Sequence, residues 1–310
     1  MNYYFKGDKL IAFTESLNIE SRNKYIQDEE FCIDENGYNL LTAINPKSVK
    51  KIDGQLVLDG KTKIKLLDKK PIAFDDSFDT ELFIDLDKLK VAAPFAEQKN
   101  TNRPILQGVY VNSNGTIIAS DSFKVYLYDN GESDDYVVLD KDLVKEICKY
   151  TGLQLFRYNK TIAQVFIEDL EITITGRLYQ GVFPNIYSLV KQYAASNTSY
   201  VLIDKNDFDK HMNIAKYIQG NSKVCKLENK TISVYDYVDE SDVYVNDLQV
   251  DSNVDFNFIL NFDQLKLSTS CFTNDVCLLF ADQTHPVVLK EKDDDKIFTL
   301  LIPLRSPNGN

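Results

Sequence analysis

The chain has 310 residues and a net charge of −12, with 35 Lys and Arg against 47 Asp and Glu. This balance argues against a protein that grips nucleic acid over its whole surface, although it leaves room for a basic stripe on an acidic body. Apolar residues make up 44% of the chain, enough for two or three domain cores, yet no run approaches a membrane span. The first residues lack the apolar stretch of a signal peptide, so we expect no membrane contact and a cytoplasmic location.

The N-terminal part of the chain predicts a shortened domain. Residues Gly54–Leu67 are typical of a hairpin with Asp59-Gly60 at its turn, and Pro71 stands where a domain-ending proline is expected. The segment Tyr4–Leu10 is similar to Phe83–Leu89 in the next part of the chain. Measured between such landmarks, the first part is about a third shorter than the second, which predicts the loss of about three strands.

The second part of the chain predicts two helices. One is expected over Asp87–Ala93, where apolar residues recur at helical spacing until Pro94 ends the pattern. The other is expected over Asp140–Tyr150, with Asp140 as its N-cap and Gly152 as a left-handed residue beyond its end.

Between these helices, Arg103–Tyr128 predicts a hairpin with an interruption. Ile105–Asn112 alternates apolar and polar residues, and Asn114-Gly115 supplies a tight turn. The returning run, Thr116–Tyr128, is broken by the polar residues Ser120-Asp121-Ser122. On pattern alone this is equally an ordinary hairpin with a polar bulge.

The third part of the chain repeats features of the second. Leu202–Phe208 is similar to Phe83–Leu89, which lies 119 positions earlier (202 − 83), and Ile302-Pro303 follows Phe183-Pro184 at the same interval. Chance similarity of short segments is the alternative to a true repeat. The repeat predicts three domains, over residues 1–80, 81–195 and 196–310.

Secondary structure in the third part follows the same plan. Helices are expected over Lys205–Ile218 and over Phe262–Ser270, the latter capped by Asn261. Short alternating runs such as Gln164–Thr175 and Val243–Val250 predict strands. A sheet whose apolar face packs against two helices is the expected domain.

The sequence offers little for catalysis. His211 lies in a predicted helix and His285 precedes a proline, settings in which packing is the usual role. No phosphate-binding glycine loop, zinc-protease motif or nucleophile elbow occurs, and the five cysteines lack zinc spacing. The acidic runs Asp134-Asp135 and Asp293–Asp295 are typical of solvated loops; an acidic-loop hydrolase, the enzyme alternative, would need clustered carboxylates. We therefore expect no enzyme activity, no cofactor and no metal.

Lysines form the informative charge pattern. Three of them recur at every fourth position of one predicted helix, and three more lie on the predicted helices of the third part. Ordinary solvated helix faces are the alternative reading of this pattern. The residues are Lys141, Lys145, Lys149, Lys210, Lys216 and Lys266.

Four short motifs follow one another along the chain. They are Arg103–Gly108, Ala119–Lys124, Val182–Asn185 and Leu300–Arg305. In order and spacing they resemble motifs of bacterial DNA polymerase III beta-subunit-type sliding clamps, over roughly residues 83–305. The resemblance implies an α+β fold of repeated clamp domains, with antiparallel sheets outside and helices lining a ring. It implies a non-enzymatic processivity factor that encircles duplex DNA without reading its sequence and tethers the replicative polymerase.

The resemblance also implies two surfaces. The six lysines would face DNA, and a groove would bind a short peptide carried by the DNA polymerase and the clamp loader. Period-two alternation predicts that Leu300, Ile302 and Leu304 share one face of the last strand. Core packing is the alternative role for the apolar members of the groove. Its expected residues are Ser120, Phe123, Lys124, Val125, Pro184, Leu189, Leu300, Ile302 and Leu304.

Several features depart from the resembled family. Phe123 and Lys124 stand where it commonly has His and Arg, and Ser122 replaces a common Gly, so the peptide preference is expected to differ. The first domain of the resembled family is full-sized. The short first part of this chain therefore indicates that it is encoded by a bacteriophage or mobile element. A homo-oligomeric ring with head-to-tail contacts is implied, a dimer being favoured over a trimer. The alternative from another class is a β-rich structural or virion protein, without basic helix stripes or clamp activity.

Overall fold

The computed structural model of the chain describes residues 1–25, 29–75, 77–97, 102–218, 223–237 and 242–305. Contacts group the chain into two compact units, Met1–Lys90 with Val137–Gln180 and Val91–Tyr136 with Gly181–Asn310. No helix in the described part of the chain is both long and apolar enough to span a membrane. The three predicted domain ranges remain a prediction.

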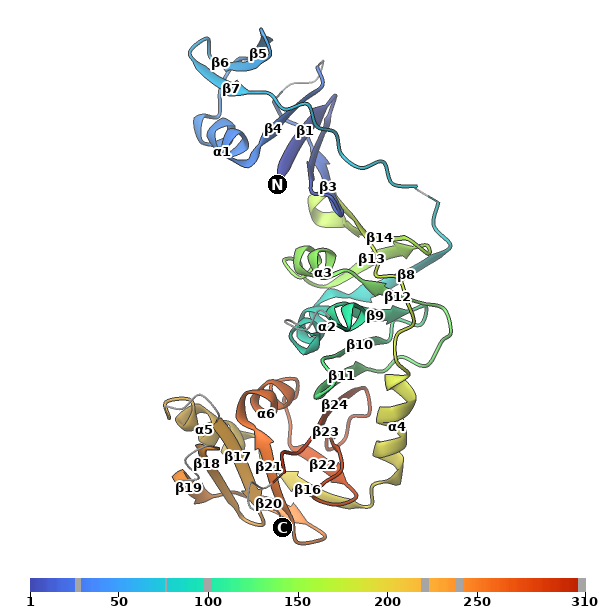
Figure 1. Ribbon diagram of the computed structural model, residues 1–310, viewed down its shortest axis with the longest axis vertical. Helices are drawn as coiled ribbons and strands as arrows, with labels where there is room; N and C mark the ends of the chain where they lie inside the picture. The colour runs from blue at the N-terminus through green and yellow to red at the C-terminus, as the bar shows by residue number, and fades with distance from the viewer. Residues whose placement is uncertain (26–28, 76, 98–101, 219–222, 238–241, 306–310) are drawn as a thin grey trace. The chain divides into compact units, whose positions relative to one another are not determined.

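Short antiparallel strands dominate the chain, with helices at intervals (Figure 1). The first part contains β1 (Asn2–Lys6), β2 (Lys9–Phe13), β3 (Leu17–Arg22), β4 (Phe31–Asp34), α1 (Glu35–Ile44), β5 (Val49–Ile52), β6 (Gln55–Leu58) and β7 (Thr62–Lys65). The second part contains β8 (Thr80–Asp85), α2 (Leu86–Ala92), the 3-10 helices η1 (Ala93–Phe95) and η2 (Pro104–Gln107), β9 (Val109–Asn112), β10 (Ile117–Ser120), β11 (Lys124–Tyr128), β12 (Tyr136–Leu139), α3 (Lys141–Ile147), β13 (Leu153–Tyr158), β14 (Ile162–Ile167), η3 (Glu168–Leu170) and β15 (Ile172–Arg177). The third part contains α4 (Ile186–Ser196), β16 (Ser199–Ile203), α5 (Lys205–Ala215), β17 (Lys223–Glu228), β18 (Thr231–Asp236), β19 (Asp242–Asp247), β20 (Val250–Ser252), β21 (Asn257–Asn261), α6 (Phe262–Thr269), β22 (Val276–Phe280), β23 (Val287–Glu291) and β24 (Ile297–Leu301).

Local sequence explains several element ends. Asp59-Gly60 adopts positive φ at both residues between β6 and β7, which confirms the predicted hairpin. Asp140 and Asn261 cap α3 and α6 with their side-chain oxygens, as predicted. Helix α3 nevertheless ends at Ile147 rather than Tyr150, because the following residues form a tighter turn in which the Tyr150 N–H donates to Ile147.

Three further predicted boundaries are wrong. Helix α5 ends at Ala215 rather than Ile218, again in a tight turn. The run Gln164–Thr175 is two strands, β14 and β15, separated by the 3-10 helix η3. The strand expected over Ile105–Asn112 starts only at Val109, because a 3-10 helix with proline at its first position precedes it.

One order of elements occurs three times along the chain. The order β1–β4, α1, β5–β7 recurs as β9–β12, α3, β13–β15, and again, with β20 as an extra strand, as β17–β19, β21, α6, β22–β24. A strand and a helix precede the second and third occurrences, namely β8 with α2 and β16 with α5. The first occurrence is therefore short by one strand and one helix, not by three strands. The similarity of Tyr4–Leu10 to Phe83–Leu89 is misleading, because the former is a hairpin and the latter a strand-to-helix junction.

A recurring backbone hydrogen bond marks equivalent positions in the three occurrences. In each, an N–H just after the last strand donates to a carbonyl of the strand that precedes the helix, over 2.7–2.9 Å. The donor and acceptor pairs are Leu67 with Cys32, Tyr179 with Val138, and Leu304 with Ile259. Leu304 is thus equivalent to Tyr179, so Pro303 and Pro184 are not equivalent. The 119-residue interval is correct where Asp85 and Asp204 precede their helices, and wrong at the end of the repeat.

Strands from successive parts of the chain join into continuous sheets. In the first unit, β3 pairs with β15 in the eight-stranded order β4-β1-β2-β3-β15-β14-β13-β8, and β5-β6-β7 form a separate sheet. In the order β12-β9-β10-β11-β24-β23-β22-β16-β20, β11 pairs with β24 in the same way. A fourth sheet has the order β19-β18-β17-β21. Strands β7 and β19 each end their sheet within the described residues.

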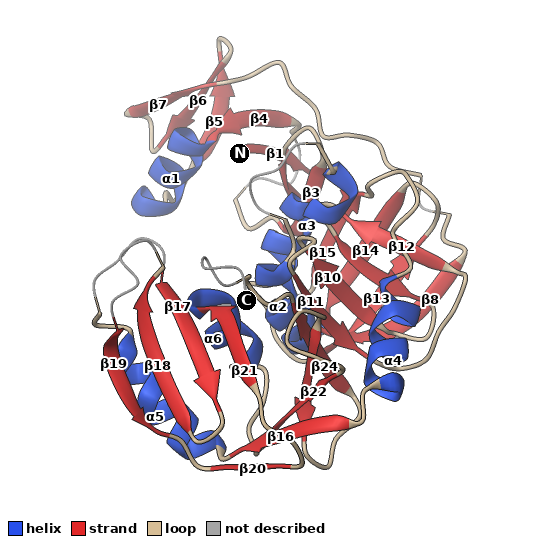
Figure 2. Cartoon of the chain, turned by 60° about the horizontal axis from the view of Figure 1, so that its bottom comes forward, coloured by secondary structure: helices blue, strands red, loops and turns tan. Residues whose placement is uncertain are grey.

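Helices pack against these sheets through apolar side chains. Phe208 and Met212 of α5 and Phe262 and Leu265 of α6 share one buried cluster with the strands of the third part. Both helices lie on the same side of the β19-β18-β17-β21 sheet (Figure 2). Antiparallel sheets covered by helices make the fold α+β, as predicted.

Close packing at Gly176 gives a stability prediction. A Cβ at this position in β15 would lie 2.9 Å from Cδ1 of Leu143, a buried residue of α3. We expect Gly176→Ala to lower the free energy of unfolding by about 1–3 kcal/mol through overpacking. The double variant with Leu143→Ala should cost less than the sum of the single changes, because the smaller side chain removes the clash. Urea unfolding measures both, and strictly additive costs would contradict the packing argument.

Candidate functional site

The interruption between β10 and β11 is a tight, hydrogen-bonded kink. Ser122 adopts a φ of +79°, and the Asp121 carboxylate accepts hydrogen bonds from the backbone N–H groups of Phe123 and Lys124. Arg103 donates from Nη1 to the Ser122 hydroxyl over 2.8 Å. With the backbone fixed in this way, the Phe123 side chain points outward and is 59% exposed. An exposed phenylalanine on a rigid turn is suited to contact a partner.

A row of side chains continues from this kink across the sheet. Ser120 lies opposite Val125, and Val125 lies opposite Leu300. Directly opposite residues of an antiparallel sheet point to the same face, so these three predicted groove residues do come together. All three are buried within this unit, Val125 to 5% and Leu300 to 3% exposure. They form the floor beneath the exposed residues.

Two exposed apolar residues follow the end of β24. The Ile302 N–H donates to the Phe123 carbonyl over 3.1 Å, so these two residues lie side by side. Ile302 is 38% exposed and Leu304 is 37% exposed. Strand β24 ends at Leu301, and the Leu304 N–H bonds to Ile259 of another sheet, so strand alternation does not extend to Leu304.

Helix α4 lies next to this region and was not predicted. Its N-cap is Asn185, whose side chain accepts from the Ser188 N–H, and the exposed Pro184 comes directly before it. The helix packs against β11, β22 and β23, and the Lys191 ammonium lies 4.6 Å from the Phe298 ring centroid. Phe298 is two residues before Leu300, so α4 covers the sheet face that carries Leu300. Leu189 on this helix is 42% exposed.

Lys124 is not placed with the other groove residues. It lies opposite Leu301, on the sheet face away from Val125, and its ammonium is paired with the Asp121 carboxylate. The side chain is buried and its charge is neutralised inside the kink. Its position indicates that it holds the turn rather than a ligand.

The equivalent junction in the first unit has different side chains. There the Arg177 N–H donates to the Ser16 carbonyl over 3.0 Å, just as Ile302 donates to Phe123. The cross-strand row of Ser120, Val125 and Leu300 is replaced by one of Phe13, Asn18 and Thr175. Ser16, Asn18, Thr175 and Arg177 are polar at the positions of Phe123, Val125, Leu300 and Ile302. One backbone arrangement therefore carries an apolar surface at one junction and a polar surface at the other.

The predicted DNA-facing lysines differ in their surroundings. Lys141 and Lys145 are exposed one turn apart on α3, as the spacing predicts. Lys149 lies in the turn after the helix, and its ammonium bonds to the nearly buried Glu146 carboxylate over 2.5 Å. Its charge is therefore largely offset locally.

The three lysines of the third part lie on or next to α5 and α6. Lys210 is exposed on α5, and Lys216 caps its C-terminus with its ammonium 4.9 Å from the Tyr217 ring centroid. Lys266 is half-buried in the last turn of α6. The sequence of α1, by contrast, contains no basic residue.

Helix α4 is anchored by Asp129, which gives a pH prediction. Burial alone would raise the pKa of Asp129, but hydrogen bonds from Lys191 and Gly131 hold that pKa below its ordinary value of 3.8. A carboxylate with a lowered pKa contributes stability above the pKa of the unfolded chain and loses it as pH falls through the folded value. We expect Asp129→Asn to lower the urea midpoint at pH 6 and to approach the wild type below about pH 4. Asp293→Asn, in an exposed loop, serves as the control, and a pH-independent difference would contradict this assignment.

No protein-family model and no curated protein sequence matches the chain. Solved structures do match. The DNA polymerase sliding clamp of Pseudomonas aeruginosa with ligand superposes with a TM-score of 0.80 at 15% identity, covering 98% of this chain and 91% of that one. The DNA polymerase III beta chain of Streptococcus pneumoniae gives 0.79 at 18% identity, with 98% and 91% covered, and the Bacillus subtilis sliding clamp gives 0.78 at 18%, with 98% and 90% covered. The chain therefore has the fold of the bacterial DNA polymerase III beta-subunit sliding clamps, as its motifs predicted.

Proposed function

We propose that the chain is a sliding clamp, a processivity factor that encircles duplex DNA and tethers a DNA polymerase. The observation that carries the proposal is the difference between the two equivalent junctions. Phe123 and Ile302 are exposed apolar residues at one junction, whereas the other has Ser16 and Arg177 at the matching positions. A surface kept apolar at one of two equivalent positions indicates partner binding rather than a need of the fold.

The occupant of this apolar groove would be an extended peptide of the polymerase or of a clamp loader. Aliphatic walls over a buried floor suit aliphatic or aromatic anchor residues. Tethering raises the effective concentration of the polymerase at its template, because a polymerase that dissociates from DNA remains bound to the clamp. No catalysis is needed for this function.

The DNA surface would consist of helices with exposed lysines. Attraction to phosphates is long-range and independent of sequence, so a duplex is held without being fixed in register. Lys141, Lys145 and Lys210 are the best candidates, since their charges are exposed on helices of an acidic protein. Residues that read base edges would hinder sliding.

Ring closure would use β7 and β19, two of the strands that end their sheets within the described residues. Within the chain, the third strand of one repeat pairs with the last strand of the next, as β3 with β15 and β11 with β24. The equivalent strands without such a partner are β19, in the third repeat, and β7, in the first. Pairing β19 of one copy with β7 of another is heterologous and closes a ring of identical chains. We favour a dimer over a trimer. We also propose that the protein is cytoplasmic and that it comes from a bacteriophage or mobile element.

The internal junctions also predict the register of this contact. From Cys32, successive cross-strand partners are Tyr4, Ile11, Glu20 and Thr173. From the equivalent Ile259, they are Lys226, Ser233 and Val245. Thr173 lies six positions before Tyr179, whose N–H donates the recurring hydrogen bond of the second repeat. In the first repeat that donor is Leu67, and the residue six positions before it is Lys61. Val245 of one copy is therefore expected to lie opposite Lys61 of the next.

The groove predicts a loss of peptide binding. We expect Ile302→Ala with Leu304→Ala to weaken a polymerase-derived peptide at least 10-fold by fluorescence anisotropy, because each lost anchor costs about 1–3 kcal/mol. Ile52→Ala, which truncates an exposed isoleucine of β5, is the matched control. Unchanged affinity in the double variant means that the groove is assigned wrongly.

The lysines predict a loss of DNA retention. We expect Lys141→Glu with Lys145→Glu to shorten the residence of the protein on circular DNA at low salt, with a smaller effect at high salt. Lys149→Glu should do less, because Glu146 already offsets that charge. Lys160→Glu, in an exposed turn, is the control for net charge. Equal effects of all these variants would point to overall charge instead of a DNA-facing stripe.

The proposed register predicts a charge rescue of the ring. We expect Val245→Lys to lower the oligomer mass measured by light scattering, because a second lysine would lie opposite Lys61. Adding Lys61→Glu should restore the mass, since the two charges then attract. A wild-type chain that stays monomeric well above micromolar concentration argues against the ring altogether.

A further inference from the structure

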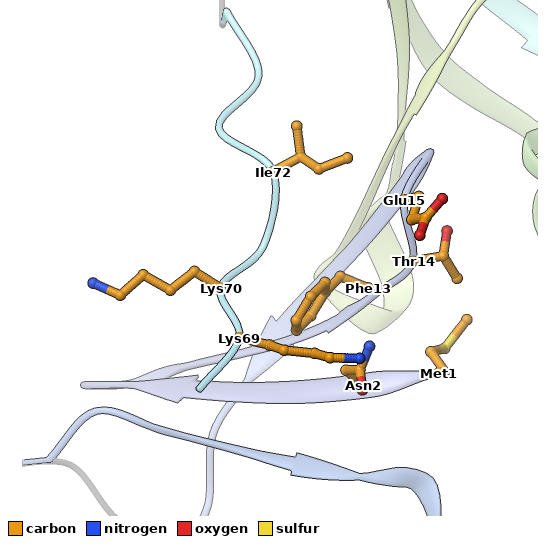
Figure 3. A pocket seen from close by; sticks show the side chains of 8 residues that line it. All are labelled: Met1, Asn2, Phe13, Thr14, Glu15, Lys69, Lys70 and Ile72. Atoms are coloured by element: carbon orange, nitrogen blue, oxygen red, sulfur yellow. The ribbon is translucent and has the colours of Figure 1, made fainter. Parts of the chain in front are cut away.

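A pocket of about 440 Å³ lies in the first unit, at the turn between β2 and β3 (Figure 3). Its floor is formed by Asn2 and by Phe13, which lie opposite each other in neighbouring strands. Thr14 and Glu15 come from the turn. The segment that follows β7 forms the other wall with Lys69, Lys70 and Ile72. The volume falls within the range of small-ligand sites.

The wall formed by the segment after β7 is held in place. The Asn18 side chain donates from Nδ2 to the Ile72 carbonyl over 2.8 Å, which fixes Ile72 beside the sheet. The N-terminal ammonium of Met1 is already bound to Glu35 over 3.2 Å. The Lys69 side chain runs from the segment toward Asn2, whereas the Lys70 side chain points away from the pocket (Figure 3). Lys69 therefore supplies the cationic group inside the pocket.

This pocket differs from the proposed polymerase groove in its chemistry. Phe13, Thr14 and Glu15 occupy the positions of Ser120, Asp121 and Ser122, because both turns join equivalent strands with three residues. The groove of the second unit has exposed apolar residues, whereas this pocket combines the apolar side chains of Phe13 and Ile72 with a lysine and polar side chains. A ligand must therefore present one charged group and one apolar group close together.

We propose that the pocket binds a short partner peptide that presents a carboxylate beside an aliphatic or aromatic side chain. The apolar side chain would lie against Phe13 and Ile72, and the carboxylate would accept a hydrogen bond from the Lys69 ammonium. Glu15 at the rim disfavours a second carboxylate, so a peptide with one acidic group fits better than a strongly acidic one. The proposal does not depend on the polymerase groove.

The experiment uses N-acetyl-Leu-Phe with a free carboxylate as the probe and its carboxamide as the paired probe. Ligand-observed NMR titration of the full chain measures the affinity of each. We expect the carboxylate to bind about 10-fold more tightly than the carboxamide, and Lys69→Glu to remove that difference. Lys160→Glu is the matched control and should leave the affinity within about twofold, because it makes the same change in net charge at an exposed residue that does not line the pocket.

A second pair of variants separates this pocket from the groove. Ile72→Asp should weaken the carboxylate probe about 10-fold or more by placing a like charge beside it, with thermal unfolding as the check on folding. Ile302→Ala with Leu304→Ala should leave probe affinity unchanged. Equal binding of carboxylate and carboxamide, wild-type affinity in Lys69→Glu, or loss of the probe in the Ile302 and Leu304 variant would each overturn the proposal.

Discussion

Backbone pairing between successive repeats is the constraint on which the rest of the structure depends. Each pairing joins the third strand of one repeat to the last strand of the next, as in β3 with β15 and β11 with β24. The N–H and carbonyl groups at a sheet edge need partners, and these pairings satisfy them within one chain. Because the series has a first and a last member, β7 and β19 remain as end strands of their sheets. These two end strands are therefore the ones that the proposed ring would pair.

The two internal junctions show how one backbone supports different surfaces. Their hydrogen bonds coincide, since Arg177 donates to Ser16 as Ile302 donates to Phe123. Only the side chains differ, and side chains on the exposed part of a junction contribute little to folding. The surface that each junction presents is therefore set by residue choice at a few positions, while backbone pairing and the buried residues keep those positions in place.

The sequence predicted features that depend on neighbouring residues alone. Asp140 and Asn261 cap their helices, and Asp59-Gly60 turns its hairpin, because each effect acts within a few residues. Prediction from the sequence failed where tertiary packing determines the structure. The burial of Val125 and Leu300 depends on strands far apart in the chain, which no local pattern encodes. Helix α4 was missed, although the N-cap Asn185 before Ile186 and Val190 was a usable signal.

The short first repeat keeps the strands on which the proposed ring depends. Strand β8, which precedes the second repeat, ends its sheet three strands away from β15, so loss of the equivalent strand leaves the β7 edge intact. Strand β3, which joins the first repeat to the second, is likewise retained. The missing helix would have been one of the surfaces able to carry lysines, and the remaining α1 has none. Because phosphate attraction is long-range and needs no fixed register, the proposed clamp would hold a duplex through the exposed lysines of the second and third repeats without a contribution from the first.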